Sequence, residues 1–335
     1  MNIQARRDDK GVRTAVVGAG AIGGLIAAAL ARGGQRVSVL ARGATLAAIR
    51  DNGIRILADD ASAGAVRVAA SDDASALGEQ DVVMLALKAQ ALPALAESLR
   101  PMVGPATLVV SAMNGLPWWF LHGLAAPEHC APLDAIDPGG RVSAVLPAER
   151  AIGCVVHLSS ATQAPGVVKR GRGNRLIVGP ARADCATAAQ TLADALNAGG
   201  FEVESTDDIR TDIWAKLWGN MNMNPLSALT GSTADRLLDD PLTHALVLRM
   251  MEEADAIGRR LGLSTGMSPP ARVAVTRELG AFKTSMLQDM EAGRALEIDP
   301  ILGVFPELGR RFDVPTPFCD AVLGLLRQRA FNAGL

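Results

Sequence analysis

The chain has 335 residues, of which 49% are hydrophobic and 20% are charged, and its formal net charge is −2. This composition is typical of a globular protein of about two domains. It argues against nucleic acid as a partner, because phosphate binding needs a clustered basic surface and base stacking needs aromatic side chains. The four cysteines and four histidines lack metal-ligand spacing, so we expect no metal site.

The N-terminal residues 1–12 lack the apolar core of a secretory signal, and we expect them to form a mobile tail. No apolar run is long enough to cross a membrane without interruption by charge or glycine. These features, together with the unpaired cysteine pattern, indicate a cytoplasmic protein without a membrane partner.

Strands and helices are expected to alternate over residues 13–206. Strand-like runs occur at 14–17, 35–43, 65–69, 81–87, 106–112 and 151–158, and helical patterns lie between several of them. Apolar strands alternating with helices predict an α/β fold, a doubly wound parallel sheet of the Rossmann type. The runs GVVKR and NRLIVG, around GRG, predict a hairpin appended to that sheet. The turn-rich segment 116–150 is expected to be an elaborated loop with short strands in this domain.

From residue 207 the pattern changes to long amphipathic segments, which predict an all-helical domain over 207–335. Its apolar stripes, including LVLRMMEEADAIG, could form either a homodimer interface or an internal core.

The first strand ends in a glycine loop that matches G-x-G-x-x-G. The loop follows a strand and opens a helix at the start of a βαβ unit, which is the context of a dinucleotide-binding motif. Its backbone N–H groups and the helix dipole would bind phosphates. The alternative is a glycine-rich turn without a ligand. The predicted cofactor-binding residues are Gly18, Ala19, Gly20, Ala21, Ile22 and Gly23.

The end of the second strand indicates which nicotinamide cofactor is bound. An acidic residue there would bind the ribose hydroxyls of NAD, whereas arginine suits the 2′-phosphate of NADP. The strand is followed by Arg42, and no Asp or Glu occurs between Arg32 and Arg50. This favours NADP(H), although Arg42 could also be an ordinary solvated arginine.

Two further polar residues follow predicted strands. Lys88 ends DVVMLALK, and Asn114 follows TLVVSAM. Ligands of open parallel sheets bind beyond the carboxyl ends of the strands, so both residues are candidates for the cofactor crevice. Taken singly, a solvated lysine and an Asn-Gly turn are the simpler interpretations.

The stretch WAKLWGNMNMNP places Lys216, Asn220 and Asn224 at intervals of four residues, on one stripe of an expected helix. Pro225 is expected to end or kink that helix at Asn224. The stripe is either a solvated face or the polar lining of a cleft in which Lys216 protonates a substrate oxygen. Desolvation lowers the pKa of a lysine and makes it a usable general acid near neutral pH.

The last polar candidates are Ser285 and Glu297, within KTSMLQDMEAGRALEIDPILG. From composition alone, a helix start at TSMLQD and a surface charge at Glu297 are the simpler interpretations.

These motifs together resemble the ketopantoate reductase family (2-dehydropantoate 2-reductases). The resemblance rests on motifs that occur in family order along most of the chain: GAGAIGG at 18–24, LALKAQ at 85–90, MNG at 113–115, WAKLWGNMNMNPLSALT at 214–230 and TSMLQDMEAGRALEID at 284–299. It implies a Rossmann domain, a helical domain, an active site in the cleft between them, and NADPH-dependent reduction of 2-dehydropantoate to pantoate.

The resemblance also implies roles for individual residues. Lys216 would be the general acid, Asn114 would orient it near the nicotinamide, and Glu297 would position Lys216 or the substrate. Lys88 would contact the cofactor near its nicotinamide ribose. The substrate's hydroxyl and carboxylate would be bound by Asn220, Asn224 and Ser285.

The chain departs from the family pattern at LPWWFLHG and after Glu297, which suggests a paralogous branch. Trp118, Trp119 and Phe120 would either reshape substrate preference or only pack against the helical domain. Two alternative functions therefore stay open: an NADP-dependent reductase of a different 2-keto acid, and a non-catalytic NADP-binding sensor.

Overall fold

The computed structural model describes residues 11–57, 62–124, 126 and 129–335. The expected tail at 1–12 lies almost entirely outside these residues. The chain divides into two compact units, one of residues 1–113 and 140–209 and the other of residues 114–139 and 210–335. The helical unit thus begins three residues beyond the expected boundary. It also takes in 114–139, which we had placed in the N-terminal domain.

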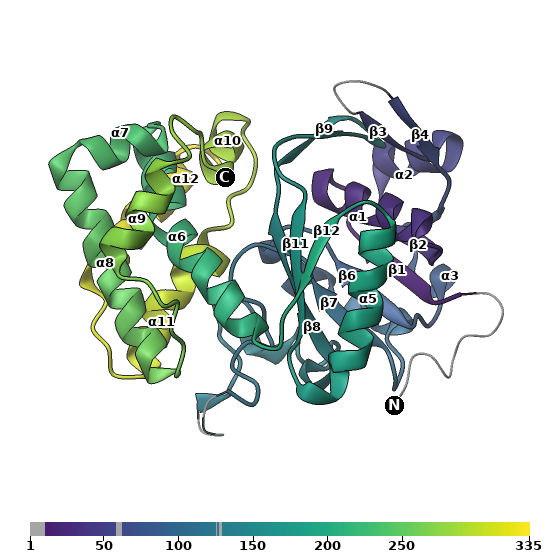
Figure 1. Ribbon diagram of the computed structural model, residues 1–335, viewed down its shortest axis with the longest axis horizontal. Helices are drawn as coiled ribbons and strands as arrows, with labels where there is room; N and C mark the ends of the chain where they lie inside the picture. Colours follow the sequence, from purple (N-terminus) through teal and green to yellow (C-terminus); the bar gives the residue numbers. More distant parts are fainter. Residues whose placement is uncertain (1–10, 58–61, 125, 127–128) are drawn as a thin grey trace. The chain divides into compact units, whose positions relative to one another are not determined.

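Unit 1 is built on an eight-stranded sheet with the order β12-β11-β8-β7-β6-β1-β2-β5 (Figure 1). All neighbours pair in parallel except β8 and β11, which pair antiparallel. The run from β5 to β8 has the Rossmann order, which confirms the predicted doubly wound fold. The strands are β1 (Arg13–Val17), β2 (Arg36–Leu40), β5 (Ala69–Ser71), β6 (Val82–Leu85), β7 (Leu108–Ser111), β8 (Ala151–His157), β11 (Arg175–Pro180) and β12 (Glu202–Ser205).

A second, four-stranded sheet has the order β4-β3-β10-β9, formed by β3 (Ile54–Leu57), β4 (Ser62–Val66), β9 (Ser160–Ala164) and β10 (Val167–Arg170). The predicted hairpin is therefore wrong. β10 pairs with β9 across a Pro165-Gly166 turn, whereas β11 pairs with β8 and β12 in the large sheet. The predicted strand at 65–69 is likewise divided, because β4 and β5 belong to different sheets.

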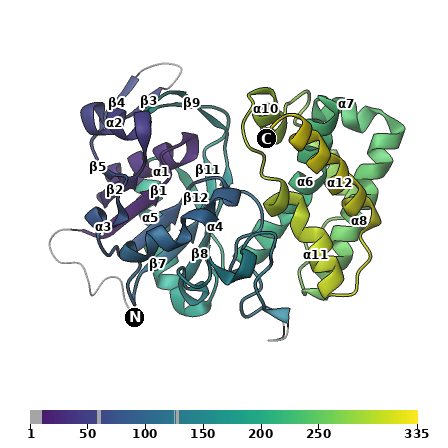
Figure 2. The same ribbon diagram turned by 180° about the vertical axis from the view of Figure 1, so that it is seen from behind.

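Helices cover both faces of the large sheet (Figures 1 and 2). On one face, α1 (Ala21–Arg32) packs against α5 (Ala186–Ala198) and also contacts the small sheet, so nearly its whole circumference is apolar. The remaining helical segments are α2 (Gly43–Asn52), α3 (Ala74–Leu77), α4 (Leu92–Leu95) and the 3-10 turns at Ala89–Ala91, Ala96–Met102, Ala148–Arg150 and Ala183–Cys185.

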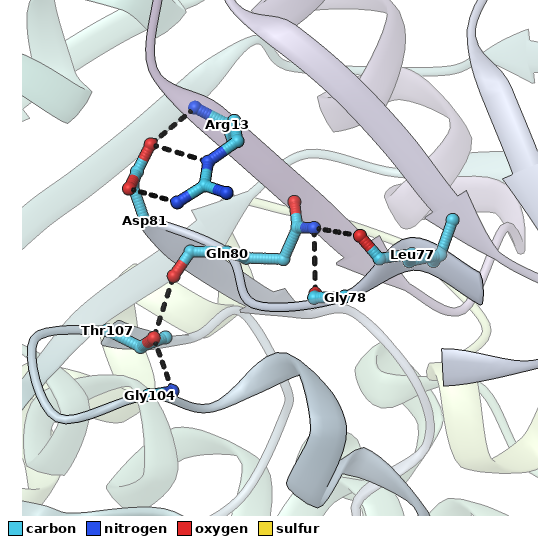
Figure 3. Close-up of polar contacts among 7 residues, drawn as sticks. All are labelled: Arg13, Leu77, Gly78, Gln80, Asp81, Gly104 and Thr107. Carbon is cyan, nitrogen blue, oxygen red and sulfur yellow. Dashed lines mark hydrogen bonds and ion pairs between the residues drawn. The ribbon is translucent and has the colours of Figure 1, made fainter. Parts of the chain in front are cut away.

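Polar contacts at the starts of three central strands help to hold their register (Figure 3). Asp81, just before β6, accepts hydrogen bonds from the backbone and guanidinium of Arg13 on β1. Thr107, just before β7, donates to the carbonyl of Gln80 at 2.7 Å. These contacts lie at the amino ends of the strands and leave the carboxyl ends to the loops that follow.

The helices of unit 2 are α6 (Ile209–Thr230), which starts at the boundary, α7 (Ala234–Asp239), α8 (Pro241–Arg260), α9 (Pro269–Arg277), α10 (Ser285–Glu291), a π-helical turn at Asp299–Gly303, α11 (Val304–Arg311) and α12 (Pro317–Asn332). The described elements beyond residue 208 are all helical, as predicted. No helix in the described part of the chain combines the length and apolar character needed to span a bilayer.

Of the two effects expected of Pro225, an end of α6 at Asn224 is wrong, because the helix continues through Pro225 to Thr230. Proline removes one helical hydrogen bond, at a cost of roughly 3 kcal/mol. The residues around it, including Met221, Met223 and Leu226, are buried and offset that loss by packing.

Candidate active site

The glycine loop of unit 1 has the conformation that its sequence predicts. Gly18 has φ +92°, which favours glycine, and a Cβ on Gly23 would lie 1.9 Å from the Gly18 carbonyl oxygen. A Cβ on Gly20 would meet nothing within 4 Å. Gly20 is also the N-cap of α1, with no side-chain cap on the first-turn N–H groups. The loop thus has tight internal packing and an open outer side at a helix N-terminus, as phosphate binding requires.

Two other cofactor candidates belong to the same unit. Lys88 lies three residues beyond β6, in the loop whose Leu87 packs near Gly18. Because β1 and β6 are the strands at which the sheet order reverses, this loop lies at the topological switch point. Arg42 is exposed at the N-cap of α2, directly after β2, and its guanidinium has no partner among the described residues. These positions fit a bound NADP(H).

In unit 2, three predicted site residues form one hydrogen-bonded chain. The Lys216 Nζ donates to Asn114 Oδ1 at 2.9 Å, and Asn114 Nδ2 donates to Glu297 Oε2 at 3.3 Å. A lysine can only donate and a carboxylate can only accept, so the amide has one favourable orientation. The amide thus links the buried carboxylate of Glu297 to the ammonium group.

Backbone packing places Asn114 in this chain. Gly115 has φ +82°, and a Cβ there would lie 2.5 Å from the Pro300 carbonyl oxygen. The same carbonyl accepts a hydrogen bond from the Leu116 N–H at 3.0 Å. Since Pro300 is only three residues beyond Glu297, this contact brings the amide and the carboxylate together.

The asparagines of α6 divide into two kinds. Asn222 is buried and donates to the Trp218 carbonyl at 2.9 Å, which is a structural role. The amides of Asn220 and Asn224 make no hydrogen bond to any residue that the structure describes, although Asn224 is only 4% exposed. Neither amide is among the buried polar atoms that lack a partner, so both keep access to solvent and can donate to and accept from a polar ligand.

Ser285 and Thr284 at the start of α10 have different functions. Thr284 is the N-cap and accepts a hydrogen bond from the Leu287 N–H. Ser285 is the first helical residue, is exposed, and has no hydrogen-bond partner among the described side chains and backbone. The helix-start interpretation of TSMLQD thus holds for Thr284 and leaves the Ser285 hydroxyl available.

The aromatic residues after Asn114 are buried core. Trp119 and Phe120 are 0% exposed, and Phe120 stacks on Trp214 with ring centroids 6.1 Å apart. Trp214 in turn contacts Phe305. This arrangement matches the packing interpretation rather than a direct role in substrate preference.

Sequence reasoning did not single out Arg272 of α9, whose guanidinium lies against Gly219 of α6. The sequence feature that could have pointed to this contact is Gly219, a glycine within the apolar helix that lies directly before Asn220 of the polar stripe.

Comparisons with known proteins agree with this geometry. Residues 14–183 match the family model "Ketopantoate reductase PanE/ApbA", and residues 208–330 match "Ketopantoate reductase PanE/ApbA C terminal". A 2-dehydropantoate 2-reductase of Mesorhizobium japonicum is 42% identical over 96% of this chain and 99% of its own.

Solved structures show the same likeness. A crystal structure described as a candidate ketopantoate reductase, from Ralstonia solanacearum MolK2, is 47% identical with a TM-score of 0.90, covering 97% of this chain and 99% of the other. A 2-dehydropantoate 2-reductase from Geobacter metallireducens GS-15 is 28% identical with a TM-score of 0.80, covering 95% of this chain and 99% of its own.

Proposed function

Because this chain belongs to the ketopantoate reductase family, we propose that it reduces 2-dehydropantoate to pantoate with NADPH, with Lys216 as the general acid. The observation that carries the proposal is the chain from Lys216 through Asn114 to Glu297. It gives the ammonium group a defined position and a nearby negative charge, which is what a proton donor needs.

NADPH, when bound, supplies the hydride that the C2 carbon of the substrate receives. The residues that would hold it are the glycine loop from Gly18 to Gly23, Lys88 and Arg42. The open side of Gly20 leaves room for a pyrophosphate on the N–H groups of α1, and the exposed Arg42 guanidinium suits a 2′-phosphate.

The other residues act on the substrate. Lys216 donates a proton to the C2 oxygen as negative charge develops there, and the same charge is stabilised by the ammonium group. Asn220, Asn224 and Ser285 bind the substrate's hydroxyl and carboxylate groups. The unpaired amides of the two asparagines support this role, since a ligand would complete their hydrogen bonding.

The test is NADPH oxidation at 340 nm with 2-dehydropantoate, comparing wild type with Lys216→Ala. We expect the variant to lose at least ~10²-fold in kcat, the usual scale for a general acid, and to retain NADPH binding. Wild type that binds NADPH but leaves 2-dehydropantoate untouched would refute the substrate. Turnover of other 2-keto acids would then identify a different reductase, and no turnover would identify a sensor.

We also propose a cytoplasmic homodimer. Phe318 and Leu325 of α12 are seven residues apart on one helix face and are 41% and 62% exposed, an apolar surface that a second copy could cover. Sedimentation equilibrium would give a mass near that of one chain if this is incorrect.

A further inference from the structure

The Arg272 side chain lies in a space that a glycine keeps open. Its Nη1 donates to Thr276 Oγ1, one turn along α9, at 2.9 Å. A Cβ on Gly219 would lie 2.2 Å from Nη2 and 2.9 Å from Cζ. Any side chain at position 219 would therefore displace the guanidinium from the surface of α6.

The charge of Arg272 has no counter-ion in the described part of the chain. The side chain is half-buried, and burial lowers the pKa of its guanidinium. None of the described residues offers it a carboxylate. By contrast, Arg277 on the same helix is exposed and pairs with Asp239 at 2.7 Å. Removing an unpaired cation from water is unfavourable, so such a group is a candidate for binding an anion.

The position of the guanidinium suits one particular anion. Gly219 lies three residues after Lys216 and one before Asn220. Residues three apart on a helix have their Cβ positions about 5–6 Å apart. In a 2-keto acid, the carboxylate carbon is bonded directly to the keto carbon. The guanidinium therefore lies against α6 within about one helical turn of the backbone of Lys216, the residue proposed to protonate the keto oxygen.

We propose that Arg272 binds the carboxylate of the 2-keto acid substrate and selects it against neutral carbonyl compounds. Gly219 is the residue that gives the guanidinium its place. This inference rests on the proposed reductase function and adds a specificity-determining residue to it. The planar guanidinium can give a carboxylate two parallel hydrogen bonds, which a lysine cannot.

The experiment compares 2-dehydropantoate with its uncharged lactone, formed when the 4-hydroxyl closes on the carboxylate. Wild type should prefer the acid in kcat/KM. Arg272→Met should lose about 10- to 100-fold with the acid, chiefly through KM, as expected for a lost charge-assisted hydrogen-bonded pair. Its activity with the lactone should stay within about threefold of wild type, since that substrate has no carboxylate to lose. Arg272→Lys should fall between the two enzymes.

Gly219→Ala is the second variant, because it keeps the arginine and displaces its guanidinium. Alanine is a better helix former than glycine, so we expect a folded protein. It should lose the preference for the acid as Arg272→Met does. Arg277→Met removes an exposed, paired arginine from the same helix and should leave the preference unchanged.

Two outcomes separate the inference from the proposed function. If wild type reduces the acid and Arg272→Met keeps its preference, or loses equally with acid and lactone, the inference is overturned and the reductase stands. If wild type reduces neither compound, the reductase proposal fails. Calorimetric titration of 2-dehydropantoate into NADPH-loaded protein then decides: binding that Arg272→Met abolishes supports the inference, and equal or absent binding overturns it.

Discussion

The amide of Asn114 links a cation to a carboxylate, and Glu297 is the residue that holds it in one orientation. Glu297→Ala should free the amide to rotate, so Lys216 loses its fixed position and kcat falls about tenfold, less than the ~10²-fold or more expected when the general acid itself is removed. Glu297→Gln keeps an oxygen acceptor for Asn114 and should retain most activity. Steady-state kinetics of both variants would show whether Glu297 acts through its hydrogen bond to Asn114 or through its charge. Equal losses of kcat in the two variants would assign the effect to the charge.

The second prediction at the scale of single residues concerns Gly20. Because no atom lies within 4 Å of its missing Cβ, Gly20→Ala should leave the stability of the cofactor-free protein within about 0.5 kcal/mol. The methyl group would instead occupy space at the N-terminus of α1, and NADPH should bind at least about tenfold more weakly. Urea denaturation and a fluorescence titration measure the two effects, and unchanged affinity would refute the phosphate-binding role.

Side-chain chemistry was more predictable than side-chain partners. Lys216 was chosen as a polar residue in an apolar helix and Asn114 by its place after a strand, whereas the role of Glu297 came only from the family resemblance. Their hydrogen-bonded chain is consistent with the roles expected of them. Arg272 was not predicted as a site residue, because an arginine in an amphipathic helix is usually exposed to solvent. Only the three-dimensional contact with Gly219 reveals a cation without a counter-ion.

At the scale of elements, segment 114–139 is joined to α11 by one arginine and one glutamate. The Arg311 guanidinium donates to the carbonyls of His129, Ala131 and Pro132. The Glu307 carboxylate accepts from the N–H groups of Asp134 and Ala135, both at 2.9 Å. These contacts explain why the segment belongs to unit 2.

Arg311→Met should therefore destabilise the protein by about 1.5–3 kcal/mol, the range for hydrogen bonds to a charged group. The neighbouring Arg310 is exposed, so Arg310→Met is the matched control and should change stability by less than about 0.5 kcal/mol. Urea midpoints at constant m-value would give the difference. Equal midpoints for the two variants would mean that the segment is held by its buried aromatic side chains alone.

Local sequence patterns could identify most strands and helices, but they could not predict which strands pair with each other. The run 65–69 has the composition of one strand, yet β4 and β5 separate into two sheets. The turn of the β9–β10 hairpin is at Pro165-Gly166, whereas GRG, which also reads as a turn, only connects the sheets. Likewise, a proline inside an apolar helix predicts an end unless the burial of its neighbours is known.

At the scale of the molecule, the alternation of strands and helices was sufficient to predict the Rossmann order of the strands in the sheet. The reason is that right-handed parallel crossovers allow few topologies. The unit boundaries were harder to predict. A segment that leaves one domain and returns to it carries no signal in its own composition, and 114–139 could be assigned only from its contacts.

The cysteines allow the two units to be followed separately. Cys154 and Cys185 are buried in unit 1, Cys319 is buried in unit 2, and Cys130 is partly exposed. Burial raises the pKa of the Cys185 and Cys319 thiols, so at neutral pH they stay protonated and unreactive until their surroundings open. Cys130 should be labelled in the native state and serves as an internal control.

Pulse labelling of these thiols along a urea series should then report where NADPH binds. The glycine loop belongs to unit 1, so NADPH at a hundredfold excess over Kd should raise the free energy of unfolding of this unit by about 2.7 kcal/mol. The urea midpoints for labelling of Cys154 and Cys185 should rise accordingly. Cys319 should shift less, because unit 2 lacks that loop. Mass spectrometry of the labelled peptides gives all midpoints in one experiment. Equal shifts would show that the two units unfold as one cooperative body, and no shift at Cys154 or Cys185 would refute the cofactor site.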